Sequence, residues 1–298
     1  MTFFLNLLYA GLVSGAIYGV FALCICMMFR VSMVLNLAIG DFAMLGALGT
    51  YMLVAGHHFP LVLAIIIVVA VIAVGAFIYD RLVLHFALDG ERAREGIFVV
   101  FFFTLALSFF IEGIGNSLFG TDVHSAPTLW NGPVLTIFGA HIERSGVLVL
   151  AAAVVVGVAL MLYLRFRLTG KALTACGDNA FGARVVAIKP SSLRLKCFVG
   201  MAVLAAVFGI IESSLSGVTN TSGAALSFTG LAAASLAALT SPGRAVIAGL
   251  AIGIAESLIG GYITTQYQTA VLYGVLVVLF ISRPQLLAAA ATEGASTA

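Results

Sequence analysis

The sequence has very little charge. Only 9% of its 298 residues are Asp, Glu, Lys or Arg, whereas 62% are hydrophobic, and the mean hydropathy is +1.18. A soluble domain carries about 25% charged residues, so this chain could not cover a water-facing surface. Its apolar runs have the length of about 20 residues that crosses a bilayer as a helix, and they lack the alternation of β-barrel strands. The sequence therefore predicts an all-α fold, a polytopic membrane helical bundle.

Cysteine is scarce, and motifs for metal or nucleotide binding are missing. The four cysteines (Cys24, Cys26, Cys176 and Cys197) have no metal-ligand spacing with histidine, so we expect neither a metal site nor a disulfide. Lys171 follows a glycine but completes no Gly-x-x-x-x-Gly-Lys-[Ser/Thr] motif, so we do not expect this chain to hydrolyse ATP itself. The first apolar run has no basic segment before it, which indicates a first span and not a cleaved signal peptide.

About 8–10 spans are predicted, with the N-terminus outside and the C-terminus in the cytoplasm. In this orientation Arg30, the group of Arg81, Arg92 and Arg94, the basic stretch 165–196 and Arg283 all fall on the inner side. The seventh segment is short and tightly joined to the eighth through Ser241-Pro-Gly, so these two could also form one broken or re-entrant element. We expect one transmembrane domain over residues 1–287 and a disordered tail at 288–298. The predicted spans are 5–28, 34–55, 59–79, 97–118, 146–164, 197–217, 226–240, 243–263 and 268–285.

Positive charge is concentrated in one short stretch. Residues 165–196 hold seven of the fourteen Lys and Arg, against one acid, Asp178. By the positive-inside rule this loop lies in the cytoplasm. Gly177 is predicted to end one helix and Asp178 with Asn179 to cap the next, which Pro190 stops. A helix of about two turns over residues 180–188 is too short to be stable alone, so it must pack against something. A protein partner is favoured over lipid headgroups, because the segment lacks a bulky apolar face.

Four acids lie within or at the ends of predicted spans: Asp41, Glu112, Glu212 and Glu256. A charge at the bilayer centre costs roughly 2.5–3.5 kcal/mol on insertion scales, so each should face a cavity or a partner. Two interpretations stay open, either capping and hydrogen bonding between helices or lining of a translocation pathway. Asn36 could share a surface with Asp41 only if the helix between them is distorted.

Two predicted spans have residues of similar character at four-residue spacing, polar residues in one span and glycines in the other. Thr104, Ser108 and Glu112 repeat every four residues, so they share one helix face, as interhelical glue or as pathway lining. Gly11, Gly15 and Gly19 repeat in the same way along the first span. Small residues at this spacing let helix backbones approach closely, which predicts packing within the bundle or, alternatively, a contact between subunits.

Several strings in this sequence, in the right order along the chain, resemble the permeases of branched-chain amino-acid ABC importers. Residues 36–46 (Asn-Leu-Ala-Ile-Gly-Asp-Phe-Ala-Met-Leu-Gly) resemble the opening signature of the first of the two paralogous permeases. Residues 104–112 (Thr-Leu-Ala-Leu-Ser-Phe-Phe-Ile-Glu) resemble a Thr-x-Gly-Leu-Ser-x-x-Leu-Gln pattern. Residues 169–184 resemble the cytoplasmic loop of the family, and 249–256 and 283–287 resemble its last spans.

The resemblance implies a type II ABC importer permease fold in the bacterial inner membrane, and ATP-driven import of a branched-chain amino acid or similar small polar or carboxylate solute by alternating access. The expected partners are a second permease in a heterodimer, two cytoplasmic ATPases that bind ATP and Mg, a periplasmic solute-binding protein and membrane lipid, without nucleic acid. The alternative is a self-sufficient secondary transporter or channel.

The same resemblance assigns two groups of residues. A coupling helix would dock in a groove of an ATPase, and the polar residues of the spans would line the translocation pathway. The expected coupling residues are Asp178, Asn179, Ala180, Phe181, Gly182, Ala183 and Arg184. The expected pathway residues are Asn36, Asp41, Thr104, Ser108, Glu112 and Glu256.

The sequence departs from the family pattern at several positions. Ile39 stands where the family usually has His, Asp41 where it has Glu, and Glu112 where it has Gln. Ala187 replaces a glycine before Ile188, and residues 238–244 (Ala-Leu-Thr-Ser-Pro-Gly-Arg) replace a Gly-Gly-x-Gly-Ser turn. These departures bear on which solute is carried and on how two turns are built.

Overall fold

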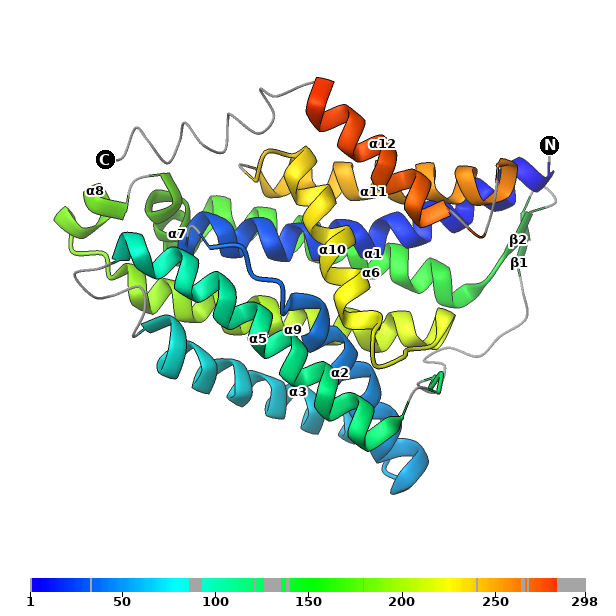
Figure 1. Cartoon of the computed structure of the whole chain (residues 1–298), viewed down its shortest axis with the longest axis horizontal. Helices are drawn as coiled ribbons and strands as arrows, with labels where there is room; N and C mark the ends of the chain where they lie inside the picture. Colours follow the sequence, from blue (N-terminus) through cyan, green and yellow to red (C-terminus); the bar gives the residue numbers. More distant parts are fainter. Residues whose placement is uncertain are drawn as a thin grey trace. The chain divides into compact units, whose positions relative to one another are not determined.

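The computed structural model describes residues 2–32, 34–85, 93–120, 122–125, 135–137, 140–178, 180–239, 241–263, 266 and 268–282. These are helices and their connections, with one antiparallel pair of short strands, β1 (Leu135–Ile137) and β2 (Ala140–Ile142) (Figure 1). The predicted polytopic helical bundle is confirmed. The tail at 288–298, which we expected to be disordered, lies outside the described residues.

Each predicted span corresponds to one helix. Seven of the described helices are long and apolar enough to cross a membrane, while α10 and α12 have 15 residues each. Two further segments, η1 (Met52–Gly56) and η2 (Asp80–Leu84), are π-helical extensions of α2 and α3. The helices are α1 (Thr2–Ser32), α2 (Ile39–Tyr51), α3 (Leu61–Tyr79), α5 (Ala93–Phe119), α6 (Arg144–Phe166), α9 (Pro190–Ser216), α10 (Ser222–Leu236), α11 (Pro242–Tyr262) and α12 (Gln268–Ser282).

Two helix starts differ from the prediction by five residues or more. The helix α2 begins at Ile39 and not at 34, and residues 34–38 before it are not helical. The helix α9 begins at Pro190 and not at 197, since proline at the first helical position needs no hydrogen bond for its missing N–H. The charged first turn of α9 is therefore part of the same helix as its apolar span.

The chain forms two compact units, described separately below. Unit 1 comprises Met1–Cys26, Leu129–Ala159 and Thr229–Ala298, and unit 2 comprises Met27–Thr128 and Leu160–Phe228. Their borders include points within the continuous helices α1, α6 and α10. A single domain over residues 1–287 stays a prediction.

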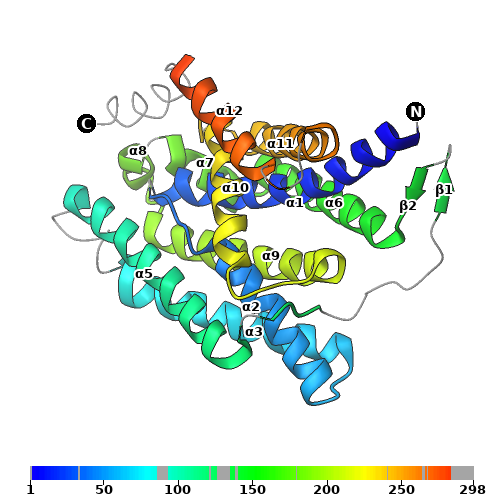
Figure 2. The ribbon, with the colours of Figure 1, turned by 45° about the vertical axis from the view of Figure 1, so that its right-hand side comes forward.

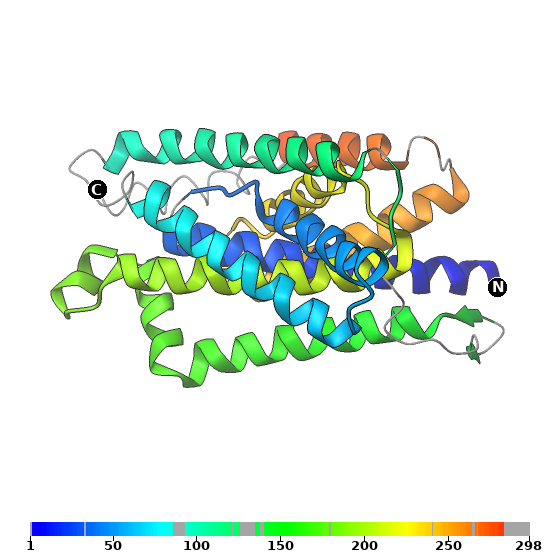
Figure 3. The same ribbon diagram turned by 90° about the horizontal axis from the view of Figure 1, so that it is seen from below.

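In unit 2 the helix α2 packs against α9, α3 and α5, and α3 packs against α9 (Figures 1 and 3). The backbones of α2 and α9 touch, since a Cβ atom added at Gly46 would lie 2.6 Å from the carbonyl oxygen of Ala206. One added at Gly209 would meet the backbone of Ala43. Lipid gives helices no hydrophobic reason to associate, so such close backbone packing is what holds α2 in place.

In unit 1 the helix α1 packs against α11 through facing glycines (Figure 2). A Cβ atom added at Gly15 would lie 2.8 Å from the Cα atom of Leu250, and one added at Gly253 would meet the backbone of Gly15. The glycine stripe of the first span therefore packs within the chain, as predicted.

We predict that Gly209→Ala destabilises the protein by about 1–3 kcal/mol, because the new methyl group would force α9 away from α2. The measurement is thermal unfolding of the purified protein in detergent. Gly200→Ala, in the same helix, is the matched control, because an added Cβ atom there meets nothing within 4 Å. Equal unfolding temperatures for the two variants would contradict the role of this contact.

Candidate functional site

The segment between α1 and α2 is not helical, and one of its buried polar groups has no hydrogen-bond partner among the described residues. The Asn36 side-chain oxygen accepts the backbone N–H of Ala38 at 2.9 Å, so it caps the local turn. The hydroxyl of Ser227 on α10 donates to the carbonyl oxygen of Leu37 at 2.5 Å and accepts the N–H of Gly40 at 2.9 Å. The amide nitrogen of Asn36 is buried and has no hydrogen-bond partner in the part of the chain that the structure describes.

Asp41 lies in the first turn of α2 and is only 1% exposed. Its side chain lies directly against Gly223 of α10, where any larger residue would collide with it. Ser108 is within hydrogen-bonding reach of the carboxyl group, and Glu112 is close enough to interact with it electrostatically. Among the described residues, the Oδ2 atom of Asp41 has no hydrogen-bond partner. An incompletely satisfied buried carboxyl group in a membrane span indicates a functional position.

The helix α5 turns its polar stripe toward the protein. Thr104 and Ser108 are buried, and Glu112 is half-buried. The Thr104 hydroxyl donates to the carbonyl oxygen of Phe101 at 2.8 Å, so this threonine is satisfied within its own helix. The other faces of α5 expose large apolar side chains: Phe102, Phe103, Phe109, Phe110 and Leu118.

Five of the six predicted pathway residues thus lie in unit 2, on α5 or at the start of α2. Asn36 precedes the helix that carries Asp41, so no distortion within a shared helix is needed. The sixth, Glu256, lies in unit 1 and is described with its cavity below. Their role in a pathway stays a prediction.

Glu212, the fourth of the membrane acids, lines a small cavity in unit 2. The cavity has a volume of about 10 Å³ and is lined also by Ala43 and Met44 of α2 and by Ser222 of α10. This volume is close to the room that one water molecule needs. Glu212 therefore lies beside a space between α2, α9 and α10 that is about large enough for one water molecule.

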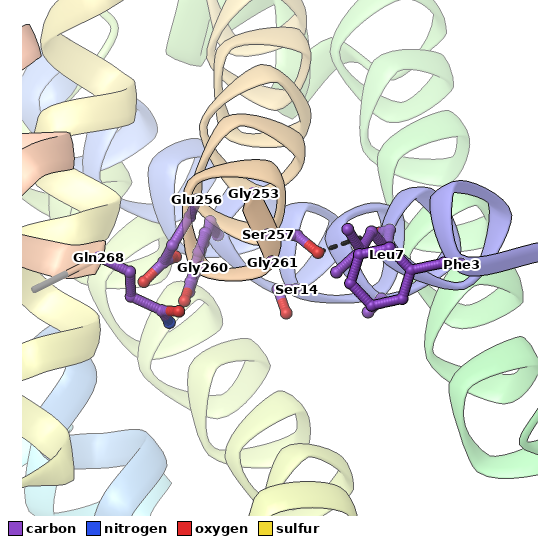
Figure 4. A pocket seen from close by; sticks show the side chains of 11 residues that line it. Phe3, Leu7, Ser14, Gly253, Glu256, Ser257, Gly260, Gly261 and Gln268 are labelled. Atoms are coloured by element: carbon purple, nitrogen blue, oxygen red, sulfur yellow. Dashed lines mark hydrogen bonds between the residues drawn. The ribbon is translucent and has the colours of Figure 1, made fainter. Parts of the chain in front are cut away.

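Unit 1 contains a larger cavity, of about 480 Å³, between α1, α11 and Gln268 at the start of α12 (Figure 4). Glu256 lines it and is 8% exposed. The hydroxyl of Ser257 donates to the carbonyl oxygen of Leu7 at 2.7 Å and so ties α11 to α1 beside the cavity. The cavity has the size typical of a site for a small molecule.

The basic loop folds into two short helices, α7 (Leu168–Asp178) and α8 (Ala180–Val185), between α6 and α9. The prediction that Gly177 ends a helix was wrong by one residue, since α7 continues to Asp178. Gly177 instead lies against the end of α1, where an added Cβ atom would be 3.1 Å from the carbonyl oxygen of Arg30. Asn179, and the side chains of Asp178, Ala180, Phe181 and Arg184, lie outside the described residues, whereas Ala183 is buried and Gly182 half-buried.

The helix α8 is shorter than the predicted segment 180–188. The N–H of Ile188 donates to the carbonyl oxygen of Ala183 at 3.1 Å, and Ala187 has φ of 61°. This hydrogen bond and a left-handed residue together form the Schellman motif that ends helices. The turn, and not Pro190 alone, therefore stops α8.

A buried ion pair joins α9 to the end of α3. Arg194 Nε lies 3.4 Å from Asp80 Oδ1, and the two side chains are 6% and 2% exposed. Next to the pair is a cavity of about 90 Å³ lined also by Arg81, His85 and Ser191. The pair fixes the first turns of α9, directly after the basic loop, to α3.

Sequence reasoning missed this pair although a signal was present. Arg194 shares a helical face with Cys197, Phe198 and Met201, all of which are buried. Asp80 continues the buried stripe of α3 at the same four-residue spacing: Ala64, Val68, Ile72, Ala76. A cation and an acid that both continue apolar stripes need each other as partners.

Comparisons with known proteins agree with this architecture. A sequence model of the family described as branched-chain amino acid transport system / permease component matches residues 7–280. The chain belongs to this family. It is 24% identical to the high-affinity branched-chain amino acid transport system permease protein LivH of Salmonella typhimurium and of Escherichia coli K12, over 95% of this chain and 94% of each relative. It is also 24% identical to BraD of Pseudomonas aeruginosa, over 94% of both chains. No solved structure matches the chain. Seven helices of the described residues are long and apolar enough to cross a membrane, so this member of the permease family is a multi-pass membrane protein.

This permease holds two turns in a left-handed conformation without glycine. Ala187 is one example, and the α10–α11 turn has φ of 54° at Ala238 and 57° at Leu239. The family pattern has glycine at the first turn and Gly-Gly-x-Gly-Ser at the second. The left-handed conformation costs a residue with a Cβ atom roughly 1–2 kcal/mol. A hydrogen bond stabilises the second turn, since the thiol of Cys26 donates to the carbonyl oxygen of Leu239 at 3.3 Å.

We predict that Ala187→Gly raises the free energy of unfolding by about 1 kcal/mol, because glycine adopts this φ without strain. Thermal unfolding of the purified permease measures the effect. Ala183→Gly is the matched control: Ala183 is buried in α8, where glycine is unfavourable, so its unfolding temperature should fall. A fall for both variants would show that Ala187 is not strained.

We predict that Arg194→Met destabilises the protein by about 3–5 kcal/mol, because it removes the guanidinium group that pairs with the buried carboxylate of Asp80. The double variant Asp80→Leu/Arg194→Met should recover most of this loss. Arg81→Met is the control, since Arg81 is exposed and stacks on Phe77, a contact that contributes about 1 kcal/mol or less. Unfolding measurements that give no recovery in the double variant would contradict the coupling of the pair.

Proposed function

We propose that this chain is the membrane-spanning permease subunit of an ATP-driven importer, and the first of its two paralogous permeases. It would carry a branched-chain amino acid or a similar small solute across the bacterial inner membrane. The observation that carries the proposal is the family match over residues 7–280. The basic loop between α6 and α9 supports it, because a six-residue helix such as α8 is too short to be stable without a partner.

The proposed partners are the other subunits that a permease subunit would need for ATP-driven import. Two cytoplasmic ATPases hold ATP and Mg, a periplasmic binding protein delivers the solute, and a second permease completes the membrane part as a heterodimer. The N-terminus is outside and the basic loop is in the cytoplasm, where it meets the ATPases.

Coupling would run through contacts of unit 2. The helix α8 packs against α7 and α9, and α7 lies against the end of α1 at Arg30. The helix α9 is joined to α3 by the ion pair of Arg194 and to α2 by close backbone packing. A push on α8 when the ATPases close would therefore move α9 together with the helix that carries Asp41. Rigid-body alternation of this kind would open the pathway to one side and then the other.

The pathway would be lined by the polar groups that the helices keep from lipid. Asp41, Ser108 and Glu112 lie together in unit 2, with Thr104 on α5 and Asn36 in the segment just before α2. Glu256 lines the cavity of unit 1. A polar lining supports passage of a small polar solute.

We predict that the double variant Asp178→Lys/Arg184→Glu loses association with the ATPase and ATP-driven uptake, because both charges lie on the proposed docking segment. Co-purification from membranes and uptake of labelled L-leucine by the reconstituted importer measure these two effects. Lys171→Glu on the exposed face of α7 is the control and should keep both activities.

Undiminished association and uptake in the double variant would reject the docking role of α8. Uptake by the purified permease without ATPases would favour the alternative, a self-sufficient transporter or channel.

A further inference from the structure

The cavity of unit 1 has one charged group. Glu256 is buried, its carboxyl group reaches the cavity, and it is the one acid among the residues that line this cavity (Figure 4). None of the residues that line the cavity is Lys, Arg or His. A buried carboxylate without a cation is costly, so a cationic ligand would be strongly favoured here.

The cavity offers further acceptors beside this carboxylate. Gln268 from the start of α12 and Ser14 from α1 line the same space. The Gln268 side-chain oxygen lies against Gly260, where any larger residue would displace it. The Ser257 hydroxyl is already used by the carbonyl oxygen of Leu7. Carboxylate, amide and hydroxyl oxygens together suit a primary ammonium, which has three N–H donors and no acceptor.

Part of the cavity wall is apolar. Phe3, Leu7 and Ala10 of α1 line the cavity, and Figure 4 shows Phe3 and Leu7 at some distance from Glu256 and Gln268. A volume of about 480 Å³ holds a small molecule with both a charged and an apolar part. A bare metal ion would leave the apolar wall without a role.

We propose that this cavity binds a primary ammonium group attached to a small apolar group, with Glu256 as its counter-ion. Two sources share this chemistry: a solute with an amino group, or the headgroup of an amine-bearing phospholipid. As a solute site, the cavity rests on the proposed function. As a lipid site, it is independent of that function.

The test is equilibrium binding of labelled isoamylamine and labelled isocaproate to the full-length permease in phosphatidylglycerol nanodiscs. Isoamylamine carries the ammonium without a carboxylate, and isocaproate carries the carboxylate without an ammonium. We expect isoamylamine to bind and isocaproate not to bind. Glu256→Gln should weaken isoamylamine binding about tenfold or more, because it removes the charge but keeps the shape.

Two further variants test whether the binding of isoamylamine occurs in this cavity and depends on its charge. Ala10→Leu adds bulk to the cavity wall without changing charge, and we expect it to weaken isoamylamine binding as well. Glu143→Gln is the matched control, because Glu143 is an exposed acid of unit 1 outside the cavity lining. Absence of isoamylamine binding, or equal binding by the protein and its Glu256→Gln variant, would overturn the proposal.

The two sources are separated by lipid composition. Competition by phosphatidylethanolamine in the nanodisc assigns the cavity to lipid headgroups, and undiminished isoamylamine binding assigns it to a solute. Binding is measured without ATPases or ATP, so a loss of ATP-driven uptake with intact binding contradicts the proposed function and not this site.

Discussion

Direct contact between the backbones of α2 and α9 is the constraint on which the rest of unit 2 depends. Glycine at 209 on α9 and at 46 on α2 removes the side chains that would separate the two helices. In lipid no hydrophobic effect would restore the contact once it is lost, because the acyl chains are as apolar as the helices. Asp41 stands at the start of α2, and Arg194 stands near the start of α9. The same contact therefore positions the polar end of α2 and ties it to the helix that leaves the basic loop.

The polar groups buried in the described part of this protein fall into two classes, those with and those without a hydrogen-bond or ion-pair partner. The Asn36 oxygen, the Thr104 hydroxyl and the pair of Asp80 with Arg194 have partners within the chain. These groups stabilise a turn, a single helix or the contact between two helices, and they do so without a ligand. The Asp41 Oδ2 atom and the Asn36 nitrogen have no hydrogen-bond partner among the described residues. Burial of a polar atom without a hydrogen-bond partner lowers the stability of the folded protein. Such an atom is expected where a bound ligand or a moving part of the protein supplies the partner during function.

Much of this architecture could be read from the sequence, because lipid permits few solutions. Long apolar runs can only be helices, so each of the nine predicted spans has its helix. The stripe of Thr104 and Ser108 faces inward as its spacing requires, and Gly15 packs against α11. Features that depend on contacts between distant segments were not foreseen. The pairing of Asp80 with Arg194 needs α3 beside α9, and the place of Gly177 against Arg30 needs α7 beside the end of α1. The cavity around Glu256 likewise depends on how closely α1 approaches α11, which the glycine stripe permits but does not determine.

The acids within the spans bear on which solute the proposed pathway would carry. The acids within the spans of unit 2, Asp41, Glu112 and Glu212, belong to three different helices, and Glu256 belongs to the cavity of unit 1. The basic residues of the sequence instead gather in the loop at 165–196. On the proposed pathway, a solute that carried only a carboxylate would meet like charge at Asp41, Glu112 and Glu256, and like charges in a medium of low dielectric repel strongly. A solute with an ammonium group gains a counter-ion at the same positions. The proposed pathway would therefore favour an amino acid or amine over a simple carboxylate, whatever the apolar part of the molecule.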